Sequence, residues 1–374
     1  MDERLDIRWG DDERQHYDLL IPHAAAAAAT SSSRPLLAFI HGGAWRSNSL
    51  AQFRPFARRL AQETSCTVAS ISYRLAPAHP HPTQALDVAQ ALEHVLSSAS
   101  STSTDAVKHS GEVVLVGHSA GAFIALQIAL AELSPSSSLM RQRRLSSSNA
   151  TSYTSTTTST ADSLERREED VASASSRRAT VVPPAVTRAV KGLVLVEGIY
   201  DLPSLLDEYP GYVSFVREAF GEDHKLQLAR VKRESGEGEG GDGGDEEEER
   251  AETRLLKTVY GRESPIRWLA SSMTDDEDDR TRAKGEEKQG GEWPHTFVLH
   301  SREDELLSLR QPDEFLTRAR VTGSAQRGHQ QQKTWLSLEE DYDSLKGKHD
   351  EVIEQRDELP GVVQAWLGQK GFVS

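Results

Sequence analysis

A serine flanked by two glycines is the first feature of the chain that could do chemistry. Residues 117–121 read Gly-His-Ser-Ala-Gly, and this G-x-S-x-G lies between an apolar run typical of a strand and one typical of a helix. In a sharp strand-to-helix turn, glycines leave room for a strained backbone, and the serine oxygen projects at the helix N-terminus. The pattern predicts Ser119 as a nucleophile; a chance match to a short motif is the alternative.

A second chemical feature is a glycine pair that follows an earlier apolar run. Residues 35–40 (PLLAFI) read as a buried strand, and residues 41–45 (HGGAW) come directly after it. Backbone N–H groups beside glycine can approach a tetrahedral oxyanion closely, and each such donor is worth about 2.7–4 kcal/mol in catalysis. The pair indicates an oxyanion-binding loop that would serve Ser119. The non-catalytic alternative is a tight turn with the half-buried Trp45 packed against it.

A serine nucleophile needs a base, and the base needs an acid that orients it. In proteins with this kind of elbow, the acid precedes the histidine along the chain. Asp304 follows the apolar run HTFVLH (residues 295–300), at the end of a predicted strand, where ligand chemistry gathers in open sheets. We expect Asp304 to be the orienting acid. The competing carboxylates are those of Glu303, Glu305, Glu197 and Asp201.

The chain has 13 histidines, and their positions separate the candidates for the base. His349 lies in a glycine-containing segment (LKGKHDEV) between the last predicted strand and the final predicted helix, so it is the expected base. His300 falls within a predicted strand and His329 within a glutamine-rich stretch, which favours structural or solvent-facing roles. His118, the variable residue of the elbow, is also expected to be structural.

The remaining pattern alternates between strand-like and helix-like segments, as in parallel α/β proteins. Apolar residues spaced three and four apart predict helices, and short continuous apolar runs predict strands buried on both faces. The predicted helices cover residues 50–61, 85–96 and 351–367, and the predicted strands cover residues 35–40, 66–73, 112–117, 191–198, 295–300 and 333–338. We therefore expect an α/β fold with a mostly parallel central sheet and helices on both faces.

Three segments lack the apolar residues that could pack against a core, and they read as insertions into a single domain spanning residues 1–374. Residues 135–184 are rich in Ser and Thr, residues 234–252 carry ten acids and one Arg, and residues 272–291 are highly charged. These segments hold most of the net charge of −15, so the charge says little about the substrate. We expect all three segments to be disordered.

Composition argues against several classes of protein. A net charge of −15 disfavours nucleic acid or an anionic membrane surface as the main partner. The single cysteine, Cys66, can form no internal disulfide, and without a cysteine cluster or an HExxH motif we expect no metal and no cofactor. Neither a signal segment nor a run of ~20 apolar residues is found. We expect a cytoplasmic protein, and a homodimer is left open.

Together the motifs resemble one known family, the kynurenine formamidases (arylformamidases) of the α/β-hydrolase fold, particularly the fungal members. The resemblance rests on HGGAW, YRLAP, GHSAGA, VEGIYDL, HSREDELLS and GKHDEV. G-x-S-x-G alone would indicate only the fold, whereas HGGxW and EGIYDL are more specific. The low-complexity inserts depart from the compact family pattern.

The resemblance implies hydrolysis of N-formyl-L-kynurenine to L-kynurenine and formate, a step in tryptophan breakdown toward NAD. It assigns Ser119 as the nucleophile and Asp304 and His349 as its partners, with His349 taking the Ser119 proton and later protonating the departing arylamine. The implied oxyanion donors are the N–H groups of Gly43, Ala44 and Ala120.

Recognition of the aryl ring is the least specified part of this interpretation. Trp45 or Tyr73 could stack on the ring, with core packing as the plainer role for Tyr73. A carboxylesterase of the same fold acting on short acyl esters is the first alternative, separated only by HGGAW and EGIYDL. A non-catalytic hydrolase fold that serves as a binding module is more distant, because the residues needed for catalysis are all present.

The inserts at residues 135–184 and 234–252 are expected to be dispensable, since few apolar residues are present to offset an ordering entropy of about 1–2 kcal/mol per residue. Replacing each with a short Gly/Ser linker should leave the thermal unfolding midpoint and the hydrolytic activity near those of the full chain. Loss of folding, or of most activity in a folded product, would place these residues inside the domain.

Overall fold

The computed structural model describes residues 1–23, 34–99, 109–134, 182–220, 257–271, 292–324, 334–335 and 337–373. The segments predicted to be disordered lie outside the described residues, apart from the last three residues of the first. There Val182 is buried and Pro184 begins a helix, so the domain resumes slightly earlier than the predicted boundary. His329 also lies outside the described residues.

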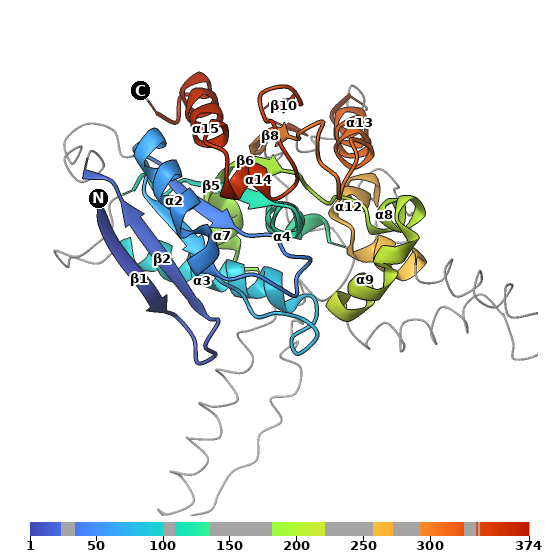
Figure 1. The fold of residues 1–374 in the computed structure, drawn as a ribbon, viewed down its shortest axis with the longest axis horizontal. Coiled ribbons are helices and arrows are strands. Elements are labelled where there is room, and N and C mark those ends of the chain that lie inside the picture. The colour runs from blue at the N-terminus through green and yellow to red at the C-terminus, as the bar shows by residue number, and fades with distance from the viewer. Residues whose placement is uncertain are drawn as a thin grey trace, which may run out of the picture.

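An eight-stranded sheet forms the centre of the fold (Figure 1), in the order β1-β2-β4-β3-β5-β6-β8-β10. The strands are β1 (Asp2–Arg8), β2 (His16–Ile21), β3 (Leu36–Ile40), β4 (Val68–Ile71), β5 (Val113–His118), β6 (Val190–Val196), β8 (His295–Leu299) and β10 (Leu338–Asp341). Pairing is parallel from β4 through β10, and antiparallel where β2 meets β1 and β4. The prediction of a mostly parallel sheet is confirmed.

Helices cover both faces of this sheet (Figure 1), as predicted. One face carries α2 (Leu50–Thr64), α14 (Glu351–Glu354) and α15 (Glu358–Gln369), and the other carries α3 (Thr83–Ala99), α4 (Ala120–Ala129) and α7 (Pro184–Ala189). The helical segments that follow β6 and β8 in the chain are α8 (Leu202–Glu208), η3 (Pro210–Tyr212), α9 (Val213–Phe220), α12 (Pro265–Ser271) and the longer α13 (Arg310–Ser324). None of the described helices is long and apolar enough to cross a membrane.

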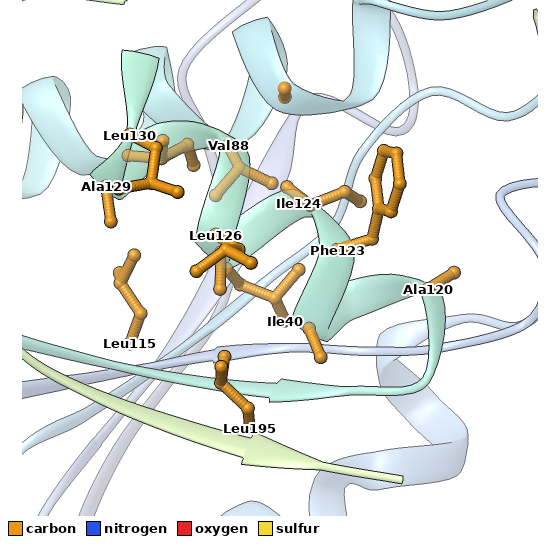
Figure 2. Packing of buried hydrophobic residues seen from close by; sticks show 14 of the residues in the cluster. Ile40, Val88, Leu115, Ala120, Phe123, Ile124, Leu126, Ala129, Leu130 and Leu195 are labelled. Carbon is orange, nitrogen blue, oxygen red and sulfur yellow. The ribbon is translucent and has the colours of Figure 1, made fainter. Parts of the chain in front are cut away.

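Alternate residues of the central strands enter two separate apolar cores. Leu37 and Phe39 of β3 pack under α2, whereas Ala38 and Ile40 pack under α3 and α4. Burial on both faces explains why these strands are continuous apolar runs in the sequence. Figure 2 shows α4 on the sheet residues Leu115 and Leu195, with Val88 of α3 on its other side. This packing fixes the first turn of α4 against the ends of the strands.

The structure differs from the predicted elements in three places. The N-terminal strands β1 and β2 were not predicted, because β1 is an exposed edge strand without an apolar run. The strand predicted at residues 333–338 is wrong: Thr334–Trp335 pairs with Glu292–Trp293, and the sheet strand begins at Leu338. The single closing helix is two helices, since Pro360 suits only the first turn of a helix, and the chain restarts at Glu358.

Gly121 is predicted to be indispensable for folding, because a Cβ there would lie 2.1 Å from Ile40 O and 2.7 Å from His41 O. Neither backbone atom can move without displacing β3. Gly121→Ala should lose about 3 kcal/mol or more of unfolding free energy, measured by urea denaturation. The control is Gly361→Ala in α15, where no atom lies within 4 Å and stability should rise by about 0.5–1 kcal/mol. An unchanged urea midpoint for Gly121→Ala would contradict the packing described here.

Candidate active site

The sequence-predicted site residues gather at the carboxyl ends of the parallel strands, where such sheets bind ligands. The glycine pair follows β3, Ser119 follows β5, and Asp304 lies in the loop after β8. His349 lies in the segment between β10 and α14. Residues far apart in the sequence are therefore brought to one edge of the sheet.

Ser119 occupies a strained turn between β5 and α4. Its backbone has φ 54° and ψ −119°, a conformation that residues with a side chain rarely adopt. The turn is held because the Ser119 N–H donates to Val196 O at 2.9 Å. A Cβ on Gly117 would lie 2.5 Å from Gly121 O, so the glycine before the serine is required. The elbow predicted from G-x-S-x-G is the observed local structure.

The glycine pair after β3 lies directly against this elbow. A Cβ on Gly42 would approach Ser119 Cβ to 2.9 Å, and Gly43 and Ala44 turn through the left-handed region with φ 103° and 48°. Within the described part of the chain, the N–H groups of Gly43, Ala44 and Ala120 donate no hydrogen bond. Three unpaired donors beside a serine form an arrangement that can stabilise an oxyanion.

Tyr73 and Trp45 are both buried behind this loop. The Tyr73 hydroxyl donates to His41 O at 2.9 Å, and its ring stacks on His41 at 4.3 Å. Burial raises the pKa of Tyr73 and lowers that of His41 to about 4, so both groups are neutral supports of the loop. Trp45 is 1% exposed and packs edge-on against Phe123. Packing accounts for both positions, and contact with a substrate ring stays a prediction.

Asp304 and His349 are in direct contact. His349 Nδ1 lies 2.8 Å from Asp304 Oδ2, while Asp304 Oδ1 accepts the N–H groups of Leu306 and Leu307 at 2.8 and 2.9 Å. Burial alone would raise the pKa of Asp304, but the neighbouring His300, His349 and Glu197 outweigh it and hold the pKa well below its ordinary value. An ionised Asp304 fixes the imidazole so that its Nε2 is left to act as a base.

The other carboxylates of the Asp304 loop hold the His349 segment by its backbone. Glu303 Oε2 accepts the Gly347 N–H at 3.2 Å, and Glu305 Oε2 accepts the His349 N–H at 3.0 Å. These two glutamates were considered only as rival acids, and their supporting role was missed. No periodicity in the sequence signals a contact between two loops that are about 45 residues apart.

The two rival acids after β6 have other partners. Asp201 precedes α8 and forms two hydrogen bonds to Arg267, at 2.7 and 2.8 Å. Glu197 Oε1 accepts the Ser301 N–H at 2.9 Å. Of the five candidate carboxylates, only that of Asp304 contacts the His349 ring among the described residues.

His118 supports His349 from the elbow side, in the structural role expected of it. His118 Nε2 lies 3.0 Å from His349 O, and the two rings are 4.9 Å apart. Burial, reinforced by the nearby His349, lowers the pKa of His118 to about 3, which keeps it neutral. A neutral His118 can donate to the His349 carbonyl, and this contact places His349 beside the residue that precedes the serine.

A row of half-buried aromatic rings, which was not predicted, lies between the Asp304 loop and the glycine-pair loop. The Tyr212 hydroxyl donates to Leu306 O at 3.0 Å, and the Tyr212 ring is 5.0 Å from Phe215. The Arg46 guanidinium lies 5.5 Å over the Phe215 ring. These rings belong to the short segment from η3 to α9, which follows the EGIYDL motif. The sequence of this segment has no motif that would have predicted a binding role.

Two clusters combine residue types that can bind metals. One is Glu197, His300 and Asp304, and the other is His118, His349 and Asp350, with donor atoms within 4.8 Å of one another in each cluster. Hydrogen bonds and ion pairs within the chain account for the first cluster without a metal. The absence of a metal stays a prediction.

The chain is similar to one known family and to two yeast enzymes. A family described as alpha/beta hydrolase fold matches residues 37–189. The kynurenine formamidase of Meyerozyma guilliermondii is 32% identical over 49% of this chain and 50% of its own length. That of Scheffersomyces stipitis is 26% identical over 51% of this chain and 60% of its own length. The predicted resemblance to fungal kynurenine formamidases is confirmed.

Esterases are also similar to the chain. Probable carboxylesterase 13 of Arabidopsis thaliana is 34% identical over 35% of this chain and 44% of its own length. The crystal structure of an inhibited esterase B from Lactobacillus rhamnosis superposes with a TM-score of 0.53 at 15% identity, covering 99% of this chain and 86% of that chain. The chain spans about half the length of the curated relatives it matches. The fold is therefore established, and the activity has to be argued from the site.

Asp304→Asn should abolish most turnover of p-nitrophenyl acetate. The N–H groups of Leu306 and Leu307 would keep the amide oxygen, so the amide NH2 would face His349 Nδ1 and donate to it, which fixes the wrong tautomer of the imidazole. In serine proteases the corresponding change costs about 10⁴-fold in kcat. Asp201→Asn is the matched control, since Asp201 pairs with Arg267 and does not contact His349. It should keep activity within a few-fold. An inactive Asp201→Asn beside an active Asp304→Asn would show that the orienting acid lies after β6.

Proposed function

We propose that this chain, which has the α/β-hydrolase fold, is a serine hydrolase that cleaves N-formyl-L-kynurenine to L-kynurenine and formate. The observation that carries the proposal is the convergence of Ser119, the Asp304–His349 pair and three unpaired N–H donors at one edge of the sheet. The similarity to yeast kynurenine formamidases supports the choice of substrate. The reaction would belong to tryptophan breakdown.

In the first half of the proposed reaction, Ser119 Oγ attacks the formyl carbon while His349 takes the hydroxyl proton. The carbonyl oxygen becomes an oxyanion that accepts from the N–H groups of Gly43, Ala44 and Ala120. The imidazolium formed on His349 is stabilised by the adjacent Asp304 carboxylate, 2.8 Å away. His349 then protonates the arylamine nitrogen as the C–N bond breaks.

In the second half, the formyl group remains as an ester on Ser119. A water molecule loses a proton to His349 and attacks the formyl carbon, with the same three N–H groups holding the oxyanion. His349 returns the proton to Ser119 Oγ as formic acid leaves, and formic acid then loses its proton to solvent to give formate. Every step uses groups that this chain supplies.

The half-buried aromatic row supports an aryl leaving group. Tyr212 and Phe215 lie between the Asp304 loop and Arg46, which directly follows the glycine-pair loop. Stacking on such rings would hold the aryl ketone of the substrate. Arg46 is 40% exposed and pairs with Glu218 at 2.8 Å, so its guanidinium is partly open to solvent, where a substrate carboxylate could meet it.

A carboxylesterase acting on short acyl esters is the second candidate, favoured by the similarity to plant carboxylesterases. The same serine, histidine and N–H donors would serve it unchanged. The two candidates differ in what surrounds the acyl group and the leaving group. Cytoplasmic location and dimerisation stay predictions for either one.

The deciding measurement is kcat/KM for N-formyl-L-kynurenine against that for p-nitrophenyl acetate. We expect the formamide to be preferred although the aryl ester has the better leaving group, because binding of the kynurenine part lowers the transition-state energy. Along p-nitrophenyl esters of increasing acyl length, kcat/KM should fall from formate to butyrate, since the proposed acyl side need hold only hydrogen.

Ser119→Ala is the control and should lose both activities together. A kcat/KM that rises through butyrate, with formylkynurenine barely turned over, would reject the formamidase and leave the carboxylesterase.

A further inference from the structure

Glu197 lies directly after β6, and one of its carboxyl oxygens is within 4.8 Å of a carboxyl oxygen of Asp304. Its side chain is fully buried, and its backbone adopts φ 48°, in the left-handed region. Strain of this kind persists only where surrounding contacts hold it, and it is common at functional sites. Neither the elbow nor the oxyanion loop accounts for a buried glutamate at this position.

The carboxyl groups of Asp304 and Glu197 differ in the number of hydrogen-bond donors that contact them. Asp304 receives the N–H groups of Leu306 and Leu307 and the Nδ1 of His349. Glu197 receives one N–H, from Ser301 to Oε1, and among the described residues the group that approaches its Oε2 is His300 Nε2, at 3.2 Å without forming a hydrogen bond. Two buried carboxyls this close cannot both ionise readily, so the charge goes to the better solvated one. That one is Asp304.

The contacts of His300 show whether this ring or a carboxyl group carries the proton of the cluster. Its Nε2 lies 3.0 Å from Leu307 O and 3.2 Å from both Glu197 Oε2 and Asp304 Oδ2. Its Nδ1 is buried without a partner in the described part of the chain. An imidazolium would leave a buried N–H unpaired at Nδ1, which is costly, so His300 is a neutral ring with its hydrogen on Nε2.

We propose that Glu197 is a positioning residue that stays protonated and donates its O–H to Asp304, so that the pair presents a single negative charge to His349. The inference rests on the proposed roles of Asp304 and His349. It assigns to Glu197 no contact with the substrate and no transfer of its proton during the reaction.

The surrounding charges agree with a neutral Glu197. Burial, followed by the hydrogen bond and charge of Asp304, raises the pKa of Glu197 to about 10, and Glu305 adds to the effect. Tyr200, whose own pKa burial raises, packs nearby without offering a positive charge, and the ring of His349 is turned toward Asp304. No Arg or Lys among the described residues pairs with Glu197.

The test compares Glu197→Gln with Glu197→Met. Gln keeps the shape, the acceptor for Ser301 N–H and a donor for Asp304, whereas Met keeps only the approximate volume. The rate of covalent labelling of Ser119 by a fluorophosphonate, and kcat/KM for p-nitrophenyl acetate, are measured against pH. The acidic limb of each profile reports protonation of the base.

We expect Glu197→Gln to keep the rate within about threefold of wild type and the midpoint of the acidic limb within about 0.3 pH units, because no charge is removed. Glu197→Met should be about 10- to 100-fold slower, since Asp304 loses a donor that orients it. A fall of the midpoint by about one unit or more in Glu197→Gln, or a loss above tenfold, overturns the proposal. A wild-type rate and profile for Glu197→Met also overturns it.

A stability measurement tests the proton without any activity. Folding raises the pKa of Glu197 from 4.5 to about 10, so its contribution to stability is complete below pH 4.5 and is lost as the pH rises toward about 10. Gln cannot titrate, so the Tm of Glu197→Gln relative to wild type should rise between about pH 6 and about pH 9. A constant difference, like that of the exposed control Glu63→Gln, means that Glu197 is ionised.

These readouts separate the inference from the proposed function. If wild-type Ser119 is not labelled by the fluorophosphonate, the proposed nucleophile fails, while the Tm comparison still decides whether Glu197 holds a proton. If labelling is normal and only formylkynurenine is not turned over, the substrate proposal fails and the role of Glu197 stands on its own pH profile.

Discussion

The close approach of α4 to the end of β3 is the constraint on which the rest of the site depends. Gly121 has no side chain, so the first turn of α4 can lie against Ile40 O, where a Cβ would come within 2.1 Å. That contact holds the serine elbow beside the glycine pair, where a Cβ on Gly42 would come within 2.9 Å of Ser119 Cβ. The strained backbone of Ser119 follows from the same geometry, because a relaxed turn would move the helix away from the sheet.

Burial limits the number of charged side chains that the site can hold. Asp304, Glu197, His300 and His118 are all buried, and water cannot screen charges among them. A single negative charge on Asp304 can stabilise an imidazolium on His349 for the short time that one exists. A second permanent negative charge would keep His349 protonated before the reaction, so that it could not accept the Ser119 proton, which gives a physical reason for neutral neighbours on both sides.

The strands with continuous apolar runs, and the turns that follow them, could be predicted from the sequence. The contacts between loops could not. Ser119 and the glycine pair follow buried apolar runs, so both the runs and the turns could be read directly. Asp304 and His349 could be ranked by strand order, and their contact needed the fold. The supports Glu303, Glu305 and Glu197 were read only as rival acids, because a carboxylate that holds a backbone N–H looks the same in sequence as one that orients a histidine.

The chemistry of the leaving group connects the buried pair to the choice of substrate. A p-nitrophenolate departs without a proton, whereas an arylamine must be protonated by His349 as the C–N bond breaks. Cleavage of a formamide therefore depends on the orientation of the imidazole in two steps, and cleavage of an activated ester depends on it mainly in one. A rigidly held Asp304, fixed by two backbone N–H groups and His349, would therefore matter more for the proposed formamide cleavage than for hydrolysis of an activated aryl ester.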